Sequence, residues 1–298
     1  MKPKKSKVIK IALISVACLI VVYVGLSTFG SYKAMTIPRL PLIHDAASLV
    51  VPYEDVSFPS RIDGVDLKGW FIPGTLSQAI IFIHGGFQNR IDDIVDTTGL
   101  ARALVERGYN VLLYDFRGRG ESAGKGMTLS HIDEDIGGGV DYLKSRGFSI
   151  KNINIIGFCS GAAETAIYAS RNEIGAVILD GCFIDDGTMV IRQAESIHLP
   201  GWLARLFLPG GRMMSFLMYR FHRIDPVNVI PDIRDPVFFI HEEKDEFTTA
   251  KETQRMYNLV VNPVKQIWEI PAAEHSRGFA TYPREYVDKI DAFLQSVR

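Results

Sequence analysis

The sequence predicts an α/β fold, in which a mostly parallel sheet is flanked by helices, carries a helical cap and follows a transmembrane helix. Two observations support this prediction. Short apolar segments rich in β-branched residues alternate with helical segments, which is the βαβ pattern of a parallel sheet. A long apolar segment without charges, residues 11–29, precedes the first of them. The remaining chain of about 250–260 residues is long enough for one large domain.

The N-terminal segment predicts a single-pass protein of the cell membrane. Five lysines lie within the first ten residues, and only Lys33 and Arg39 follow soon after the apolar segment. As a helix, residues 11–29 span about 28 Å, roughly the thickness of the hydrocarbon core. The positive-inside rule then places the lysines in the cytoplasm and the domain outside. The predicted units are a stub and anchor at 1–30, a linker at 31–50 and the external domain at 51–298.

Two other interpretations of the apolar segment remain open. A cleaved signal peptide needs a shorter apolar core and a cleavage site of small residues, and residues 27–31 form a poor site. Cys18 follows Ser-Val-Ala, faintly like the box of a lipoprotein, but eleven uncharged residues come after it. An uncleaved anchor, with Cys18 in the middle of the membrane, explains the whole segment better.

The first part of the domain predicts the edge of the sheet. Two strands around the turn at 62–64 form a hairpin. Further on, the helical segment 130–146 contains three consecutive glycines at 137–139, each of which costs helix stability. We attribute these glycines to close packing of the helix on the sheet. The net charge is −1 and the basic cluster is N-terminal, so nucleic acid is not expected as a partner.

A sharp turn between a strand and a helix provides the candidate nucleophile. The strand 152–156 leads into Gly-Phe-Cys-Ser-Gly at 157–161, and a helical segment, 162–168, follows. This arrangement is the nucleophile elbow, whose central residue is strained and whose small neighbours make room for the turn. Cys159 is then the nucleophile. A frame one residue later would select Ser160, but it would put a phenylalanine where a small side chain is needed.

An acyl-transfer site also needs a base and an acid that orients it. On this type of sheet the chain order is nucleophile, acid, histidine. The loop 241–245 follows a buried strand and offers Asp245 as the acid, because Asp245 reaches furthest towards the neighbouring strand. The competing carboxylates in that loop are Glu242 and Glu243. The loop 271–275 after the last strand ends in His275, the expected base, at the sheet edge where sites of α/β sheets collect.

The upstream half of the domain supplies donors for an oxyanion. The strand 79–83 runs into His-Gly-Gly at 84–86, where glycines let backbone N–H groups face a ligand. We expect the N–H groups of Gly86 and Ser160 to hold the oxyanion, with the positive end of the elbow helix behind Ser160. His84 is a candidate second base, although a structural role beneath the site suits this tightly packed loop better.

The insertion 183–233 is expected to be an apolar helical cap. Its leucine, phenylalanine and methionine side chains either pack the cap onto the core or form an acyl-binding wall that touches the bilayer surface, and both interpretations stay open. His198 and His222 show no metal-ligand spacing, and no metal is expected. Cys182 is expected to be a small buried residue close to Cys159, and the cysteine count implies no disulfide framework.

These motifs resemble those of the α/β-hydrolase superfamily over nearly all of the chain from Glu54. Residues 84–86 resemble its oxyanion loop, 114–122 its turn after the fourth strand, and 225–226 the end of its cap. Within the superfamily the chain looks most like membrane-anchored bacterial hydrolases of the esterase or serine-peptidase type. It departs from them at Cys159, and dienelactone hydrolase is a relative that uses such a Cys-His-Asp triad.

A thiol nucleophile favours particular substrates. A histidine-paired cysteine at a helix N-terminus has a pKa of about 3.5–7.5, so its attack needs no proton transfer. Because thiolate leaves a tetrahedral intermediate readily, amides tend to revert unless His275 protonates the amine first. We therefore expect hydrolysis of an ester, thioester or related bond in a small-molecule or lipid-like acyl substrate, without a cofactor. A membrane-anchored peptidase and a non-catalytic binding protein are the alternatives, and the intact order of Asp245 and His275 argues against the second.

Overall fold

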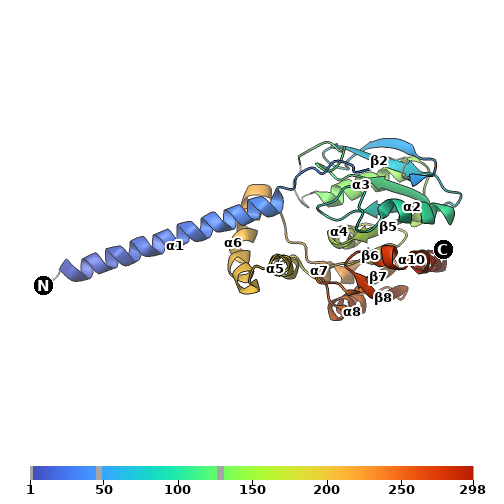
Figure 1. Ribbon diagram of the computed structural model, residues 1–298. Coiled ribbons are helices and arrows are strands. Elements are labelled where there is room, and N and C mark those ends of the chain that lie inside the picture. The colour runs from blue at the N-terminus through green and yellow to red at the C-terminus, as the bar shows by residue number, and fades with distance from the viewer. Residues whose placement is uncertain (1–2, 45–48, 126–130, 298) are drawn as a thin grey trace.

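An eight-stranded sheet forms the centre of the protein (Figure 1). The computed structural model describes residues 3–44, 49–125 and 131–297. The strand order is β1-β2-β4-β3-β5-β6-β7-β8; β2 runs antiparallel to β1 and β4, and the other neighbours are parallel. The strands are β1 (Glu54–Pro59), β2 (Asp66–Ile72), β3 (Ala79–Ile83), β4 (Asn110–Tyr114), β5 (Ile153–Phe158), β6 (Val177–Asp180), β7 (Val237–Lys244) and β8 (Lys265–Glu274). The predicted hairpin and mostly parallel sheet are therefore confirmed.

Helices cover both faces of this sheet. The helices are α1 (Pro3–Met35), α2 (Thr97–Glu106), α3 (Ile132–Ser145), α4 (Ser160–Ala169), α5 (Asp186–Ser196), α6 (Gly201–Tyr219), α7 (Pro226–Val229), α8 (Ala250–Leu259), α9 (Gly278–Thr281) and α10 (Pro283–Ser296), with 3-10 turns η2 (Ile150–Asn152) and η3 (Ile230–Asp232). On β3, Ile81 and Ile83 join the core beneath α3, α4 and α8, while Ile80 and Phe82 join the core beneath α2 and α10. Because both faces are covered, the central strands are apolar throughout.

The triple glycine of α3 does allow close packing. A Cβ atom at Gly138 would lie 2.5 Å from the carbonyl oxygen of Pro59 at the end of β1, and one at Gly139 would lie 3.3 Å from the Tyr114 ring. The helix begins at Ile132. Ser130, where the helix was expected to begin, lies outside the described residues.

Three boundaries near the candidate site differ from the prediction. The loops expected at 241–245 and 271–275 are mostly strand, because β7 and β8 keep pairing with each other as far as Lys244 and Glu274, with a bulge after Glu242. Asp245 and the base at position 275 are consequently each the first residue after a strand. The elbow helix begins at position 160, two residues earlier than predicted.

The N-terminal helix projects away from the sheet (Figure 1). It continues to Met35, so the first five residues of the predicted linker are helical, and the first of them, Ser31, contacts Ser215 of the cap. Within the described part of the chain, Lys7–Met35 is the single stretch long and apolar enough to cross a membrane, with a mean hydropathy of 2.6.

The cap after β6 is helical, as predicted, but the core does not cover all of it. Helices α5, α6 and α7 lie between β6 and β7, and α6 packs against α1. Several apolar side chains of α6 stay exposed, so packing onto the core accounts for only part of this segment. The exposed ones are Trp202, Leu206, Met213, Phe216, Leu217 and Met218.

Candidate active site

Cys159 lies at the tip of a sharp turn between β5 and α4. Its φ of 54° and ψ of −120° are costly for a residue with a side chain. A Cβ atom at Gly157 would lie 2.5 Å from the carbonyl oxygen of Gly161, and one at Gly161 would lie 2.3 Å from that of Ile83. Phe158 is buried in the core. The two sites that require glycine thus flank Cys159 symmetrically, which favours the frame that has Cys159 at its centre.

His275 and Asp245 form a fixed pair beside this turn. Nδ1 of His275 lies 2.7 Å from Oδ2 of Asp245. The other carboxylate oxygen accepts the N–H groups of Phe247 at 2.7 Å and Thr248 at 3.0 Å. The Asp245 side chain is fully buried, and the Phe247 ring meets the imidazole edge-on. Both oxygens of the acid are therefore occupied, and the imidazole is held in one orientation.

The second imidazole nitrogen of His275 is not occupied by another group of the described residues. Nε2 of His275 is buried and has no nitrogen or oxygen partner among the described residues. Burial alone lowers the pKa of His275, but interactions with Cys159 and Asp245 raise this pKa well above its ordinary value. Gly181, at φ 60°, leaves room for the His275 ring, because a Cβ atom at position 181 would lie 2.8 Å from Cε1 of His275. The electrostatics favour the protonated, cationic form of His275.

The loop after β3 covers the elbow. A Cβ atom at Gly85 would lie 3.8 Å from that of Cys159. The expected oxyanion donor, the N–H of Gly86, donates here to the hydroxyl of Ser160. Ser160 is the first residue of α4, so its own N–H lies at the positive end of that helix. The two expected donors, the N–H groups of Gly86 and Ser160, are thus close together, and the Ser160 hydroxyl accepts the N–H of Gly86.

Arg119 fixes this loop, and sequence reasoning missed it. Its Nε and Nη2 donate to the carbonyl oxygen of Gly86 at 3.0 and 2.8 Å. Burial, together with the nearby charge of Arg39, lowers the pKa of Arg119 to about 10, so it remains a cation at neutral pH. The repeated Arg-Gly in the turn after β4 was the available signal. Which of its arginines turns inward depends on the packing of that turn.

His84 has the structural role that its loop suggested. Nδ1 lies 2.8 Å from the carbonyl oxygen of Gly85, and Nε2 accepts the N–H of Phe116 at 3.2 Å. Burial lowers the pKa of His84 to about 3, which keeps the ring neutral. With both nitrogens occupied, His84 cannot serve as a second base.

A buried pair of carboxyl groups lies behind His275. Asp180 ends β6 and accepts a hydrogen bond from the Tyr286 hydroxyl, and Glu242 lies next to it on β7. Burial, followed by the charge of Asp180, raises the pKa of Glu242 well above its usual value. Both oxygens of Glu242 and Oδ1 of Asp180 receive no N–H or O–H group from the described residues, and burial raises the pKa of both carboxyls, which favours their protonated forms.

Hydrogen bonds distinguish the three candidate acids, Glu242, Glu243 and Asp245. Atoms of Glu242, Asp245 and His275 lie within 4.8 Å of one another, a spacing that could hold a metal. Of these carboxylates, Asp245 is the one hydrogen-bonded to the imidazole. Glu243 is exposed and accepts the backbone N–H of Ala272 at 2.7 Å. Asp245 is therefore best placed to orient the base.

A second acidic group with metal-ligand spacing lies in the cap, formed by Asp185, Asp186 and Asp225. Asp185 caps α5 by accepting the N–H of Thr188. The other two carboxylates form ion pairs with arginines 212 and 223. Existing partners within the chain thus account for this cluster.

Cys182 is buried, as expected. Its thiol contacts the carbonyl oxygen of Phe183 at 3.6 Å, and burial, with a smaller contribution from Cys159, raises the pKa of this thiol. Both cysteines are free. Cys182 is therefore a weakly acidic core residue.

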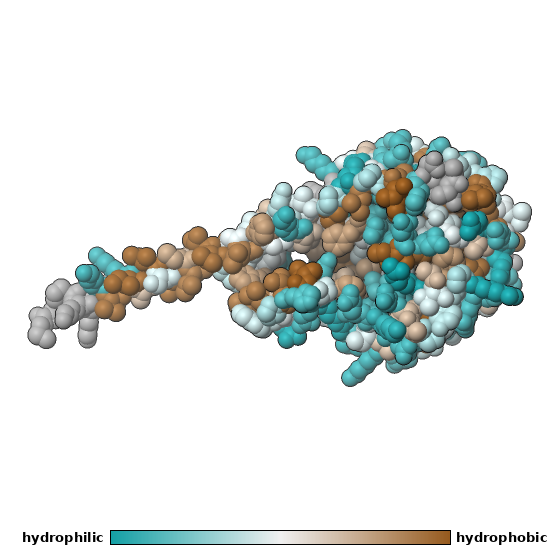
Figure 2. Space-filling model, viewed as in Figure 1, coloured by the Kyte–Doolittle hydropathy of each residue, from teal (hydrophilic) through white to brown (hydrophobic). Residues whose placement is uncertain are grey.

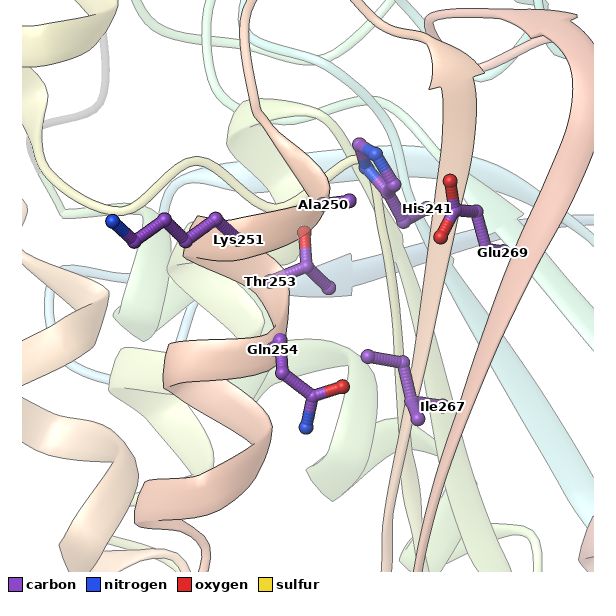
Figure 3. A pocket seen from close by; sticks show the side chains of 7 residues that line it. All are labelled: His241, Ala250, Lys251, Thr253, Gln254, Ile267 and Glu269. Atoms are coloured by element: carbon purple, nitrogen blue, oxygen red, sulfur yellow. The ribbon is translucent and has the colours of Figure 1, made fainter.

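A cavity of about 320 Å³ lies on the other face of β7, between β7, β8 and α8 (Figure 3). His241 borders this cavity, while its neighbour Glu242 points to the opposite face of the sheet, towards Asp180, since side chains alternate along a strand. The lining residues are His241, Ala250, Lys251, Thr253, Gln254, Ile267 and Glu269. None of the predicted site residues lines it.

Residues 80–292 match the alpha/beta hydrolase family. The uncharacterized protein YqkD of Bacillus subtilis is 28% identical over 275 residues, which cover 85% of this chain and 84% of that protein. Polyketide transferase GrgF of a Penicillium species is 30% identical over 142 residues, 45% of this chain and 47% of that one. The fold is similar to that of an esterase from Pyrococcus furiosus, with a TM-score of 0.74 and 27% identity over 88% of this chain and 98% of that one. The chain belongs to the alpha/beta hydrolase family and has esterase structural neighbours.

Proposed function

We propose that this member of the alpha/beta hydrolase family cleaves an ester, thioester or related acyl bond through an acyl intermediate on Cys159. One observation carries the proposal. Cys159 at the elbow interacts electrostatically with His275, whose Nδ1 is held by Asp245. Nucleophile, base and orienting acid come from the carboxyl ends of three strands, which is the arrangement of a catalytic triad.

In the proposed first step, the Cys159 thiolate attacks the substrate carbonyl carbon, and the carbonyl electron pair moves onto oxygen. The N–H groups of Ser160 and Gly86 receive this oxyanion. For Gly86 this requires the Ser160 hydroxyl to turn away, because the hydroxyl accepts that N–H in the present structure. Arg119 holds the Gly86 peptide in place from its carbonyl side.

The tetrahedral intermediate then collapses. The bond from carbon to the leaving oxygen or sulfur breaks as His275 gives its Nε2 proton to that atom, and an acyl thioester on Cys159 remains. Water transfers a proton to His275 and attacks the thioester, after which the thiolate leaves and an acid is released. Because thiolate is a better leaving group than an amine, this sequence suits esters and thioesters better than peptides.

We also propose that α1 anchors the protein in the cell membrane with the hydrolase domain outside and the cap at 183–233 beside the anchor. The length and hydropathy of Lys7–Met35 and the five lysines in the first ten residues support this orientation. The proposed substrate is a small-molecule or lipid-like acyl compound.

The thiolate gives the proposal a direct test. The rate at which iodoacetamide alkylates Cys159 in the full-length protein should stay high well below pH 8, read at that site by mass spectrometry. In His275→Ala the pH dependence of the rate should instead be that of an ordinary cysteine, whose pKa is about 8.5. Hydrolysis of a panel of acyl-chain lengths should be lost together with the reactive thiolate. If the unchanged protein also titrates near pH 8.5, the thiolate mechanism fails and a binding protein becomes the better interpretation.

A further inference from the structure

The cap is attached to the N-terminal helix along one face. Tyr23, Ser27 and Ser31 recur every fourth residue of α1, and each of them lies against α6. The Tyr23 ring stacks on Phe207 of α6 with ring centres 5.2 Å apart. Figure 1 shows α6 beside the half of α1 that is nearer the sheet.

The contacts between the two helices are short and specific. The Tyr23 hydroxyl donates to the carbonyl oxygen of Leu206 at 3.1 Å and accepts the N–H of Gly210 at 3.2 Å. These two groups are four residues apart, so the hydroxyl enters the helical hydrogen-bond ladder next to Pro209, where a helix is already disturbed. The Tyr23 hydroxyl of α1 therefore takes part in the backbone hydrogen bonding of α6.

Small residues bring the two backbones together. A Cβ atom at Gly210 would lie 2.3 Å from the Ser27 hydroxyl oxygen, and the hydroxyls of Ser31 and Ser215 are 2.8 Å apart and buried. Close approach through glycine and serine, with hydroxyl hydrogen bonds across the interface, is typical of helices that associate within membranes.

These contacts determine the depth of α6 if α1 crosses the membrane. The charge-free part of α1 runs from Ile11 to Tyr32. It is about 33 Å long as a helix, close to the thickness of the hydrocarbon core. Tyr23 to Ser31 lie in its second half, on the side of the domain. Because α6 touches this half, it lies at the depth of the leaflet nearer the domain.

The face of α6 that turns away from the protein is apolar. Its exposed residues follow helical spacing, and we call them the lipid-facing stripe: Trp202, Leu206, Met213 and Leu217, with exposed fractions of 65%, 51%, 52% and 58%. Arg205 and Arg220 are exposed near its two ends, and α6 contains no acidic residue. Figure 2 shows apolar surface on the projecting α1 and on the cap beside it.

We propose that α6 enters the outer leaflet of the bilayer beside α1, with the lipid-facing stripe among acyl chains, Arg220 at the headgroup phosphates and the long Arg205 side chain extended towards them. An apolar helical face flanked by arginine and tryptophan is what a lipid–water boundary accommodates. This inference rests on the proposed membrane anchoring and adds a second membrane contact to it. The cap, and not only the anchor, then sets the orientation of the domain on the membrane.

Tryptophan fluorescence tests the contact in the full-length protein. Trp70 is buried and Trp268 is half-buried, whereas Trp202 lies in the stripe. In phosphatidylcholine vesicles whose acyl chains carry bromine, the emission should be quenched relative to vesicles of the same lipid without bromine. Trp202→Phe should remove most of this quenching, and the matched variant Trp268→Phe should retain it. Equal quenching in the two variants, or none in the unchanged protein, would overturn the inference.

Activity measured in the same vesicles separates this inference from the proposed chemistry. Quenching through Trp202 without hydrolysis of a soluble short-chain ester supports the membrane contact and contradicts the acyl-enzyme proposal. Hydrolysis without quenching contradicts the membrane contact and leaves the chemistry intact. A full-length protein that does not float with the vesicles overturns the inference directly.

Discussion

Two regions of the protein are built by opposite means: the candidate site formed by Cys159, Asp245 and His275, which we call the crest, and the paired helices α1 and α6. In the crest, the acid Asp245 is buried and accepts three hydrogen bonds. In the helix pair, two hydroxyl contacts hold a mostly apolar interface while large apolar side chains stay exposed. Function in the crest therefore depends on single atoms, whereas the behaviour of the helix pair depends on the solvent around it.

The largest effect should come from the nucleophile. Cys159→Ala should lower kcat/KM for a soluble ester by about 10⁴–10⁶-fold, as loss of a triad member does. Ser160→Ala keeps its backbone N–H and also frees the N–H of Gly86, so its effect should be about tenfold or less. If Ser160→Ala is inactive and Cys159→Ala is active, the serine is the nucleophile and the crest has been assigned wrongly.

Spacing within the crest should have the next largest effect. In Gly181→Ala the new methyl group would press on the His275 ring, and misplacing a catalytic group by about 1 Å costs on the order of 10²-fold in rate. Gly147→Ala is the matched control, because Gly147 also has positive φ but has open space around it. Both variants should lose about 1–2 kcal/mol of stability from the backbone. Equal activity in the two would show that the crest tolerates displacement.

The buried carboxyl behind the crest should make stability depend on pH. Glu242 keeps its proton in the folded protein far above the pKa of about 4.5 at which the unfolded chain loses it. The folded state then binds more protons, so stability falls as pH rises above that value, by at most about 1.4 kcal/mol per pH unit. Glu242→Gln removes this dependence. The melting temperature of the variant, relative to that of the unchanged protein, should therefore rise from pH 5 to pH 8.

Glu164 provides the control for this experiment. It is also buried, and burial, followed by nearby Asp133, raises the pKa of its carboxyl well above the usual value. Glu164→Gln should therefore show the same stability trend. Glu242→Gln alone should also shift the pH profile of kcat/KM, because atoms of Glu242, Asp245 and His275 lie within 4.8 Å of one another. A melting difference that stays constant with pH would refute the buried proton.

The smallest effect on activity should come from the helix pair. Gly210→Ala forces α6 away from α1, because its methyl group would overlap Ser27 and Tyr23, while Gly211→Ala meets open space. Overpacking costs about 1–3 kcal/mol, so Gly210→Ala should melt a few degrees lower. Gly211→Ala should keep or raise the melting temperature, since alanine favours the helix. Neither variant should change kcat/KM for a soluble ester. A large loss of kcat/KM in Gly210→Ala would show that the helix pair and the crest are coupled.

Local patterns predicted the elements that carry the candidate site. The elbow at 157–161, the order of Asp245 and His275, and the apolar N-terminal helix are each contained in short stretches whose periodicity or glycine spacing has one common structural solution. Hydrophobic patterning also predicted the parallel sheet, because strands buried on both faces have to be apolar throughout.

The tertiary structure alone decided which distant residues complete these elements. Arg119 reaches Gly86 across 33 positions of the chain, Tyr286 reaches Asp180 across 106, and Tyr23 reaches α6 across 183. The sequence by itself determined where the backbone turns, strains or becomes apolar, because those properties arise within a few residues. Which buried polar groups share partners, and which face of α6 remains uncovered, depends on packing between segments that no local pattern links.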